Sequence, residues 1–141
     1  MKIRAAQIND IGTIANIHFA AWPSVYRGKI PDSYLNTLKF EDFSIRWQSY
    51  FRDQINEILV LEDQTTVLGF ICFGRCDDQE LQQLSVAEIF YIYFDPSVRG
   101  KGYGEKLYRQ AETVIKSENY KCICIKVLGS VDNWFGGFKK R

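Results

Sequence analysis

The feature that most constrains this chain is a strand-like run followed at once by a glycine-rich turn and a helix-like segment. Residues Val86 to Phe94 (VAEIFYIYF) are apolar on both faces, as expected of a central strand. The turn Asp95-Pro96-Ser97 leads into Arg99-Gly100-Lys101-Gly102-Tyr103-Gly104. Apolar side chains then follow at helical spacing, at Leu107, Ala111, Val114 and Ile115. Glycines let the backbone approach a ligand closely, and the first turn of a helix attracts phosphate. The sequence therefore predicts a site for a phosphate-bearing cofactor.

Other glycine motifs fit this turn less well. A dinucleotide-binding fingerprint needs Gly-x-Gly-x-x-Gly, but the spacing here is Gly-x-Gly-x-Gly and position 105 is Glu. A P-loop needs Gly-Lys-Ser/Thr, which is absent. The remaining alternative is a glycine-rich turn that binds nothing. The cations Arg99 and Lys101 favour the phosphate site over that alternative.

Composition narrows the class of protein. A chain of 141 residues is long enough for one domain, expected over residues 1–141. Its net charge of +1 gives no reason to expect a nucleic-acid or membrane partner, and neither a signal peptide nor a membrane-spanning run is apparent. Four cysteines lie in apolar, strand-like runs without the spacing of a zinc site: Cys72, Cys76, Cys122 and Cys124. We expect free thiols, no metal, and a cytoplasmic protein.

The periodicity along the chain predicts a mixed α/β domain in the order β-α-α-β-β-β-α-β. The last three elements are the central strand, the helix after the glycines and a final strand. The pattern also predicts that Pro23 ends the first helix and that two consecutive strands form an antiparallel hairpin. The expected strands are Lys2–Ala6, Ile55–Glu62, Thr66–Cys76, Val86–Phe94 and Tyr120–Leu128. The expected helices before the second strand are Ile11–Trp22 and Pro31–Leu38, and Phe43–Phe51 is either another helix or a continuation of the second one after a kink near Lys39 to Glu41.

These elements resemble one family. Residues 99–104 fit the Arg/Gln-x-x-Gly-x-Gly/Ala signature of the GNAT superfamily of acetyl-CoA-dependent N-acetyltransferases, and Tyr91 to Pro96 is similar to that family's fourth strand and turn. The order of elements matches from Lys2 to Leu128, and Trp22 to Gly28 is similar to the opening helices of many bacterial members. The resemblance implies a mostly antiparallel sheet flanked by helices, with acetyl-CoA as co-substrate.

The resemblance also implies site residues. The fourth strand of the family bulges and separates from the fifth, and the pantetheine arm pairs with its backbone, here at Ile92, Tyr93 and Phe94. The pyrophosphate would meet the N–H groups of residues 99–104, and Asn133 matches an asparagine that contacts the cofactor. Trp22 and Tyr26 match positions that usually form the wall of the acceptor pocket in the family, although aromatic residues at a helix end more often belong to the core.

Glu88 is the candidate general base, because it is the one charged residue within the central strand. A carboxylate near the pocket could take the proton that an ammonium group must lose before attack, directly or through a water. Some GNAT members resemble the segment Ala87-Glu88-Ile89. The alternative is a strand-end glutamate that reaches solvent or a cation. His18, the one histidine, shares a helical face with Ile11, Ile14 and Trp22 and is expected to be structural.

The C-terminal pattern departs from the family. Members usually continue with a helix and a last strand, and a tyrosine there often protonates the leaving thiolate. Only 13 residues follow Leu128 here, with no tyrosine beyond Tyr120, so no general acid is assigned. We expect a five-stranded sheet with a shortened, irregular tail. The exposed edge of the fifth strand would then form a homodimer or be covered by Trp134, Phe135 and Phe138.

Two functions from different classes follow. The leading one is an N-acetyltransferase that moves an acetyl group from acetyl-CoA to a primary amine of a small molecule or peptide by direct attack. The alternative is a non-catalytic or weakly active acyl-CoA-binding module, because the C-terminal elements are missing. A nucleotide-dependent enzyme of another fold is disfavoured by the spacing of the glycines.

Overall fold

The computed structural model describes residues 1–26, 28, 31–54, 56–76, 85–127 and 130–132. Over these residues the strands form one six-stranded sheet in the order β1-β2-β3-β4-β5-β6, so neighbours in sequence are neighbours in space. All pairs are antiparallel except β4 and β5, which are parallel and connected by α4. The elements are β1 (Lys2–Ala5), α1 (Ile11–Tyr26), α2 (Asp32–Leu35), α3 (Phe40–Asp53), β2 (Glu57–Asp63), β3 (Thr66–Arg75), β4 (Val86–Phe94), α4 (Tyr103–Ser117), β5 (Cys122–Val127) and β6 (Ser130–Asp132).

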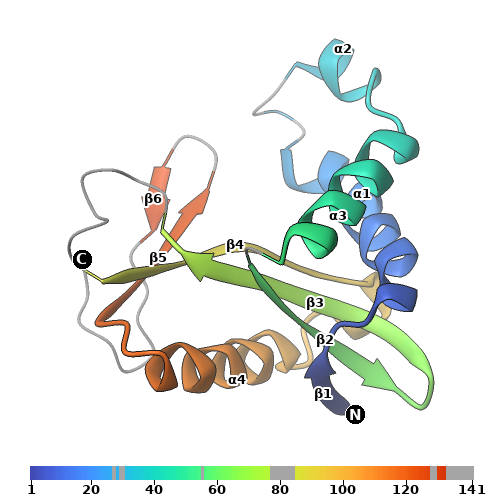
Figure 1. Ribbon diagram of the computed structural model, residues 1–141. Helices are drawn as coiled ribbons and strands as arrows, with labels where there is room; N and C mark the ends of the chain where they lie inside the picture. Colours follow the sequence, from blue (N-terminus) through green and yellow to red (C-terminus); the bar gives the residue numbers. More distant parts are fainter. Residues whose placement is uncertain (27, 29–30, 55, 77–84, 128–129, 133–141) are drawn as a thin grey trace.

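The helices cover both faces of the sheet (Figure 1). Helices α1 and α3 pack together on one face, and α4 crosses the other face. Alternate residues of the strands therefore enter two separate cores. Phe70 and Cys72 of β3 belong to the α1/α3 core, whereas Ile71 and Phe73 belong to the α4 core. Helix α4 contributes one apolar stripe to its core, namely Leu107, Tyr108, Ala111 and Ile115.

The sequence predicted most of these elements. The boundaries of β4 coincide with those expected, and β2 and β3 form the expected hairpin with Gln64 in a left-handed conformation in its turn. The prediction that Pro23 ends the first helix is wrong, because α1 continues to Tyr26. A proline within a helix removes one backbone hydrogen bond. The packing of α1 through Ile14, Ala15 and Ala21, all essentially inaccessible to solvent, offsets that loss.

The expectation of a five-stranded sheet with an exposed fifth strand is also wrong. A short strand, β6, pairs antiparallel with the end of β5, from Ile125–Asp132 to Val127–Ser130. Only two residues separate the two strands, which is the length of a tight hairpin connection. In the described residues β6 covers only the last three residues of β5, so this edge is partly paired, and a homodimer stays a prediction. Residues 134, 135 and 138, expected to cover that edge, lie outside the described residues.

His18 lies at the centre of the α1/α3 core, as its helical face predicted. Its side chain is inaccessible to solvent and contacts six aromatic rings, those of Trp22, Phe43, Trp47, Phe70, Tyr91 and Tyr93. Trp47 Nε1 donates a hydrogen bond of 3.0 Å to Nδ1 of His18, so the ring must be neutral there. Burial, with a smaller contribution from the charge of Arg46, lowers the pKa of His18 to about 4.

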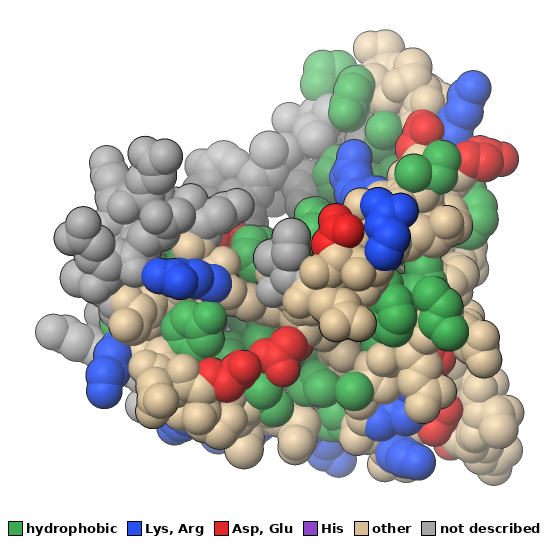
Figure 2. Space-filling view, viewed as in Figure 1, with side chains coloured by type: hydrophobic (Ala, Val, Ile, Leu, Met, Phe, Trp, Pro, Cys, Tyr) green, Lys and Arg blue, Asp and Glu red, His purple; other side chains and the backbone are tan. Residues whose placement is uncertain are grey.

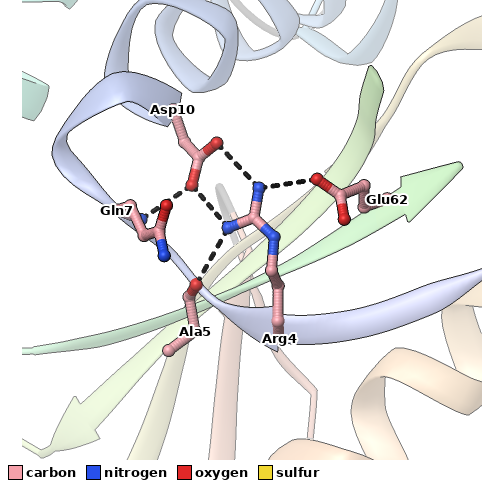
Figure 3. A network of polar contacts seen from close by, with 5 residues as sticks. All are labelled: Arg4, Ala5, Gln7, Asp10 and Glu62. Carbon is pink, nitrogen blue, oxygen red and sulfur yellow. Dashed lines mark hydrogen bonds and ion pairs between the residues drawn. The ribbon is translucent and has the colours of Figure 1, made fainter. Parts of the chain in front are cut away.

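Arg4 connects the first strand to two neighbouring elements (Figure 3). Its guanidinium donates two hydrogen bonds to Asp10, of 2.8 and 3.0 Å, and one of 2.9 Å to Glu62 on β2. Asp10 also accepts the backbone N–H of Gln7, which caps the turn before α1. The guanidinium lowers the pKa of Asp10, which is itself almost completely buried. This network holds β1, β2 and the start of α1 in one geometry.

We predict that Arg4→Met destabilises the fold by about 2–3 kcal/mol, because Asp10 would remain buried without its cation. The pair contributes above the ordinary carboxyl pKa of 3.8 and loses its contribution as the pH falls through the lowered value in the folded protein. The difference in unfolding free energy between the wild type and Arg4→Met should therefore shrink as the pH falls below 3.8. Denaturant unfolding at pH 7 and pH 3 measures it. The control is Arg52→Met, since Arg52 and Asp53 are 75% and 48% exposed; equal losses in both variants would contradict the prediction.

The second prediction concerns His18→Gln, which keeps an acceptor for Trp47 but removes the titrating ring. Between the ordinary pKa of 6.5 and about 4, the unfolded chain binds a proton at residue 18 and the folded chain does not. Acidification across this range should lower the free energy of unfolding of the wild type by about 3 kcal/mol more than that of the variant. Taking the difference between the two proteins removes the contribution of every other group. Parallel pH profiles of unfolding free energy would contradict it.

Candidate functional site

The centre of the candidate site is a β-bulge in β4. Along the β3–β4 pair, Cys72 is opposite Tyr91 but Phe73 is opposite Ile89, so Phe90 is an extra residue. The pairing of β4 with β5 runs from Val86 to Ile89 and ends at the same place. In the part of the chain that the structure describes, β4 therefore continues for five residues with a strand on one side only. The backbone of Phe90 to Phe94 on the other side is available to a ligand that adds as a strand.

The end of β4 contacts both β3 and the first turn of α4. The N–H of Asp95 donates to the carbonyl of Leu68 on β3 at 2.8 Å, and the Asp95 carboxylate accepts the N–H of Ser97 at 2.9 Å. The Phe94 ring lies over Gly69, where a Cβ would overlap it, and 3.7 Å from the Cβ position of Gly104. One aromatic ring thus packs between β3 and the first turn of α4, which keeps the glycine loop against the end of β4.

The glycine loop leaves its backbone open to the outside. Gly100 and Gly102 have φ angles of +75° and +85°, which side chains other than glycine rarely adopt. A Cβ at either position would meet nothing within 4 Å. Gly102 is the N-cap of the 15-residue helix α4 and offers no side chain to its first-turn N–H groups. These amides therefore have no side-chain cap from Gly102 at the positive end of the helix dipole.

The charges around this helix end favour an anion. Arg99 donates from Nε to the carbonyl of Phe94 at 3.1 Å, so its cation is held at the end of β4. Lys101 is exposed in the loop, and Lys106 lies over the Tyr103 ring. The one acidic residue of the first turn, Glu105, accepts two hydrogen bonds from Arg109, one turn further along the helix. On the face that Figure 2 shows, charges of both signs are interspersed.

Glu88 lies on β4 two residues before the bulge and is only 6% exposed. Its neighbours on the sheet are Gly74 of β3 and Cys124 of β5. Ala87 and Ile89 enter the α4 core, so Glu88 faces the opposite side of the sheet, where α1 and α3 pack. The site therefore has the glycine loop at the C-terminal end of β4 and a buried carboxyl group on the other side of the bulge.

The other expected site residues lie in different surroundings. Trp22 is half-buried and its ring contacts His18 and Phe43, so at least part of it belongs to the core. Tyr26 is the last residue of α1, and Asn133 lies outside the described residues. None of the four cysteines, all of which lie in the described residues, forms a disulfide, and Cys122 alone is half-buried rather than buried. Among the described residues, no three His, Cys, Asp or Glu side chains gather as metal ligands would. None of the described helices has the length and hydropathy of a membrane span.

A pocket of about 240 Å³ lies beside the start of β2. It is lined by Ala5, Ala6, Phe51, Gln54, Asn56, Glu57, Ile58 and Leu59. Burial and a hydrogen bond with Glu118 raise the pKa of Glu57 to about 7. Sequence reasoning missed Asn56, whose side chain borders this pocket and also lies over Gly74, next to Glu88 on β4. No local signal marks it, because the contact depends on the register of three strands.

Comparison with known proteins agrees with this geometry. The family model described as "Acetyltransferase (GNAT) family" matches residues 14–133. The uncharacterized N-acetyltransferase YuaI of Bacillus subtilis (strain 168) is 26% identical over 129 residues, which cover 91% of this chain and 72% of that protein.

Solved structures share the fold. An N-acetyltransferase from Staphylococcus aureus Mu50 is 25% identical, with a TM-score of 0.69 over 92% of this chain and 74% of that one. The PaiA N-acetyltransferase from Thermoplasma acidophilum, solved in complex with coenzyme A, is 20% identical, with a TM-score of 0.69 over 89% and 78% of the two chains. Because the family model extends over most of a chain whose central strand bulges and separates from its parallel neighbour, this protein belongs to the GNAT family of acetyltransferases.

Proposed function

We propose that this protein is an N-acetyltransferase that transfers the acetyl group of acetyl-CoA to a primary amine by direct attack. The observation that carries the proposal is the end of β4 beyond Ile89, which has no strand on its β5 side in the described residues and leads into an open helix N-terminus. A long thiol cofactor with a diphosphate at one end fits both features at once. The structure of the Thermoplasma relative with coenzyme A supports this choice of co-substrate.

Acetyl-CoA would bind along two surfaces of this chain. Backbone groups of Ile92, Tyr93 and Phe94 would pair with the amides of the pantetheine arm as an added strand does. The N–H groups of residues 99–104 would hold the diphosphate, with Arg99 and Lys101 adding charge. Because the bulge lies where β4 leaves β5, the thioester would lie near Phe90. Backbone N–H groups there would stabilise the oxyanion that forms on attack.

Glu88 would act as the general base. It lies on the side of the bulge opposite to the glycine loop, where an amine could approach the thioester from the other direction. Its carboxylate would take the proton of an incoming ammonium group, directly or through a water, so that the neutral amine can attack. We propose that Trp22 and Tyr26, both near the end of α1, wall the acceptor side, and that Asn133 contacts the cofactor.

We predict that Gly102→Val abolishes acetyl-CoA binding. A side chain at this N-cap would fill the open space over the loop backbone and strain a φ angle of +85°. Isothermal titration calorimetry with acetyl-CoA measures the effect, and circular dichroism checks the fold. The control is Gly28→Val, because Gly28 has the same left-handed conformation, φ +87°, and open surroundings far along the chain from the loop. Equal affinity in Gly102→Val and wild type would refute the diphosphate site.

We predict that Glu88→Gln lowers kcat by about 100-fold while leaving acetyl-CoA affinity unchanged, because an amide cannot accept the proton. Thiol release from acetyl-CoA over a panel of amines measures turnover. Glu112→Gln is the matched control, since Glu112 is also 6% exposed but lies on α4, on the other face of the sheet. If both variants turn over like the wild type, Glu88 is structural. If the wild type binds acetyl-CoA but releases no thiol with any amine, the protein is an acyl-CoA-binding module.

A further inference from the structure

Strands β3, β4 and β5, together with the residue directly before β2, place one residue each in a row across the sheet, on the face on which α1 and α3 pack. Glu57 pairs with Phe73 in an antiparallel ladder. Asn56, which precedes Glu57, therefore lies beside Gly74, which follows Phe73. The pairs Gly74–Glu88 and Glu88–Cys124 continue the row across β3, β4 and β5. The row is therefore Asn56, Gly74, Glu88 and Cys124.

Gly74 leaves the space that the side chain of Asn56 occupies. A Cβ at Gly74 would overlap Oδ1 of Asn56 and lie 3.3 Å from its Cγ, so the carboxamide of Asn56 occupies the space of a missing side chain. Directly opposed Cβ positions in an antiparallel pair are only about 4.5–5.5 Å apart. The Asn56 carboxamide thus reaches over β3 toward the side chain of Glu88, and any larger residue at position 74 would push it back.

The chemistry of the two groups is complementary to an amine. The carbonyl oxygen of Asn56 and the carboxylate of Glu88 are both hydrogen-bond acceptors, and Gly74 supplies no side chain between them. A primary amine offers two N–H donors in addition to the lone pair that attacks the thioester. Asn56 is half-buried, so part of the residue is accessible to a ligand.

We propose that Asn56, positioned by Gly74, is a specificity-determining residue that accepts one N–H of the acceptor amine while Glu88 accepts the other. This inference rests on the proposed function. The acceptor class it assigns is a primary amine, selected over N-methylated amines because these lack the second donor. Losing one hydrogen bond of this kind changes affinity by about tenfold.

The first test needs no turnover. The side-chain NH₂ signals of Asn56 are followed by NMR while n-butylammonium chloride is added to the complex with coenzyme A, and are assigned by their loss in Asn56→Leu. We expect a saturable shift with n-butylammonium and none with tetramethylammonium at equal ionic strength. Gly74→Ala should abolish the shift. An absent shift in the wild type, or an unchanged one in Gly74→Ala, would overturn the proposal even if acetyl-CoA binds.

The second test uses the amine that gives the fastest thiol release and its N-methyl derivative. Asn56→Leu should raise KM for the primary amine about tenfold, leave kcat within about threefold, and reduce the preference for the primary amine. Gln48→Leu, which removes an exposed carboxamide of α3, should change nothing. Gly74→Ala should add no further effect in the Asn56→Leu background. An unchanged KM and preference in Asn56→Leu would refute the role of Asn56. If instead acetyl-CoA binds to neither protein, the proposed function fails, and the NMR titration, repeated without coenzyme A, still decides the role of Asn56.

Discussion

β4 changes from a strand paired on both sides to a strand paired on one side, and the rest of the site depends on that change. Before Phe90, β4 is held between β3 and β5, and its residues are buried. After Phe90 it keeps β3 but has no β5 partner among the described residues, and its residues are half-buried. A sheet interior cannot offer unpaired backbone to a ligand without such an interruption, because unsatisfied buried N–H and C=O groups are costly. The bulge creates an edge inside the sheet where a cofactor can complete the pairing.

The structure around this edge is rigid where the ligand must be located. The N–H of Asp95 is bonded to β3, and the Phe94 ring packs against Gly69 and Gly104, so both ends of the loop contact the sheet through these groups. On the opposite face, Tyr91 and Tyr93 pack around the neutral ring of His18. The aromatic core beneath β4 is therefore part of the support for the site, although none of its rings except that of Trp22 was expected to meet a substrate. Preorganised backbone donors of this kind stabilise developing charge without reorganisation.

The sequence revealed the parts of this arrangement that depend on local chemistry. The apolar run of β4, the glycines and the amphipathic spacing of α4 are each determined within about 15 residues, and each was predicted at its observed place. The continuation of α1 through Pro23 was missed because tertiary packing outweighed one lost hydrogen bond. β6 was missed because three residues carry too little periodicity to indicate a strand. The bulge at Phe90 was expected only from the family resemblance, since an uninterrupted apolar run contains no sign of a register shift.

The row that contains Asn56 and Glu88 shows most clearly which features the sequence alone cannot predict. Its members come from three strands and from the residue directly before a fourth, and their proximity requires three separate registers to hold at once. A single-residue slip in any of them would turn a member to the other face of the sheet. Gly74 could be read from the sequence only as a glycine in a strand, which usually marks a close approach of some other group. In the structure that group is a carboxamide. The glycine that weakens β3 as a strand is therefore also the one that lets a polar side chain lie beside the candidate base, which gives a physical reason for tolerating it there.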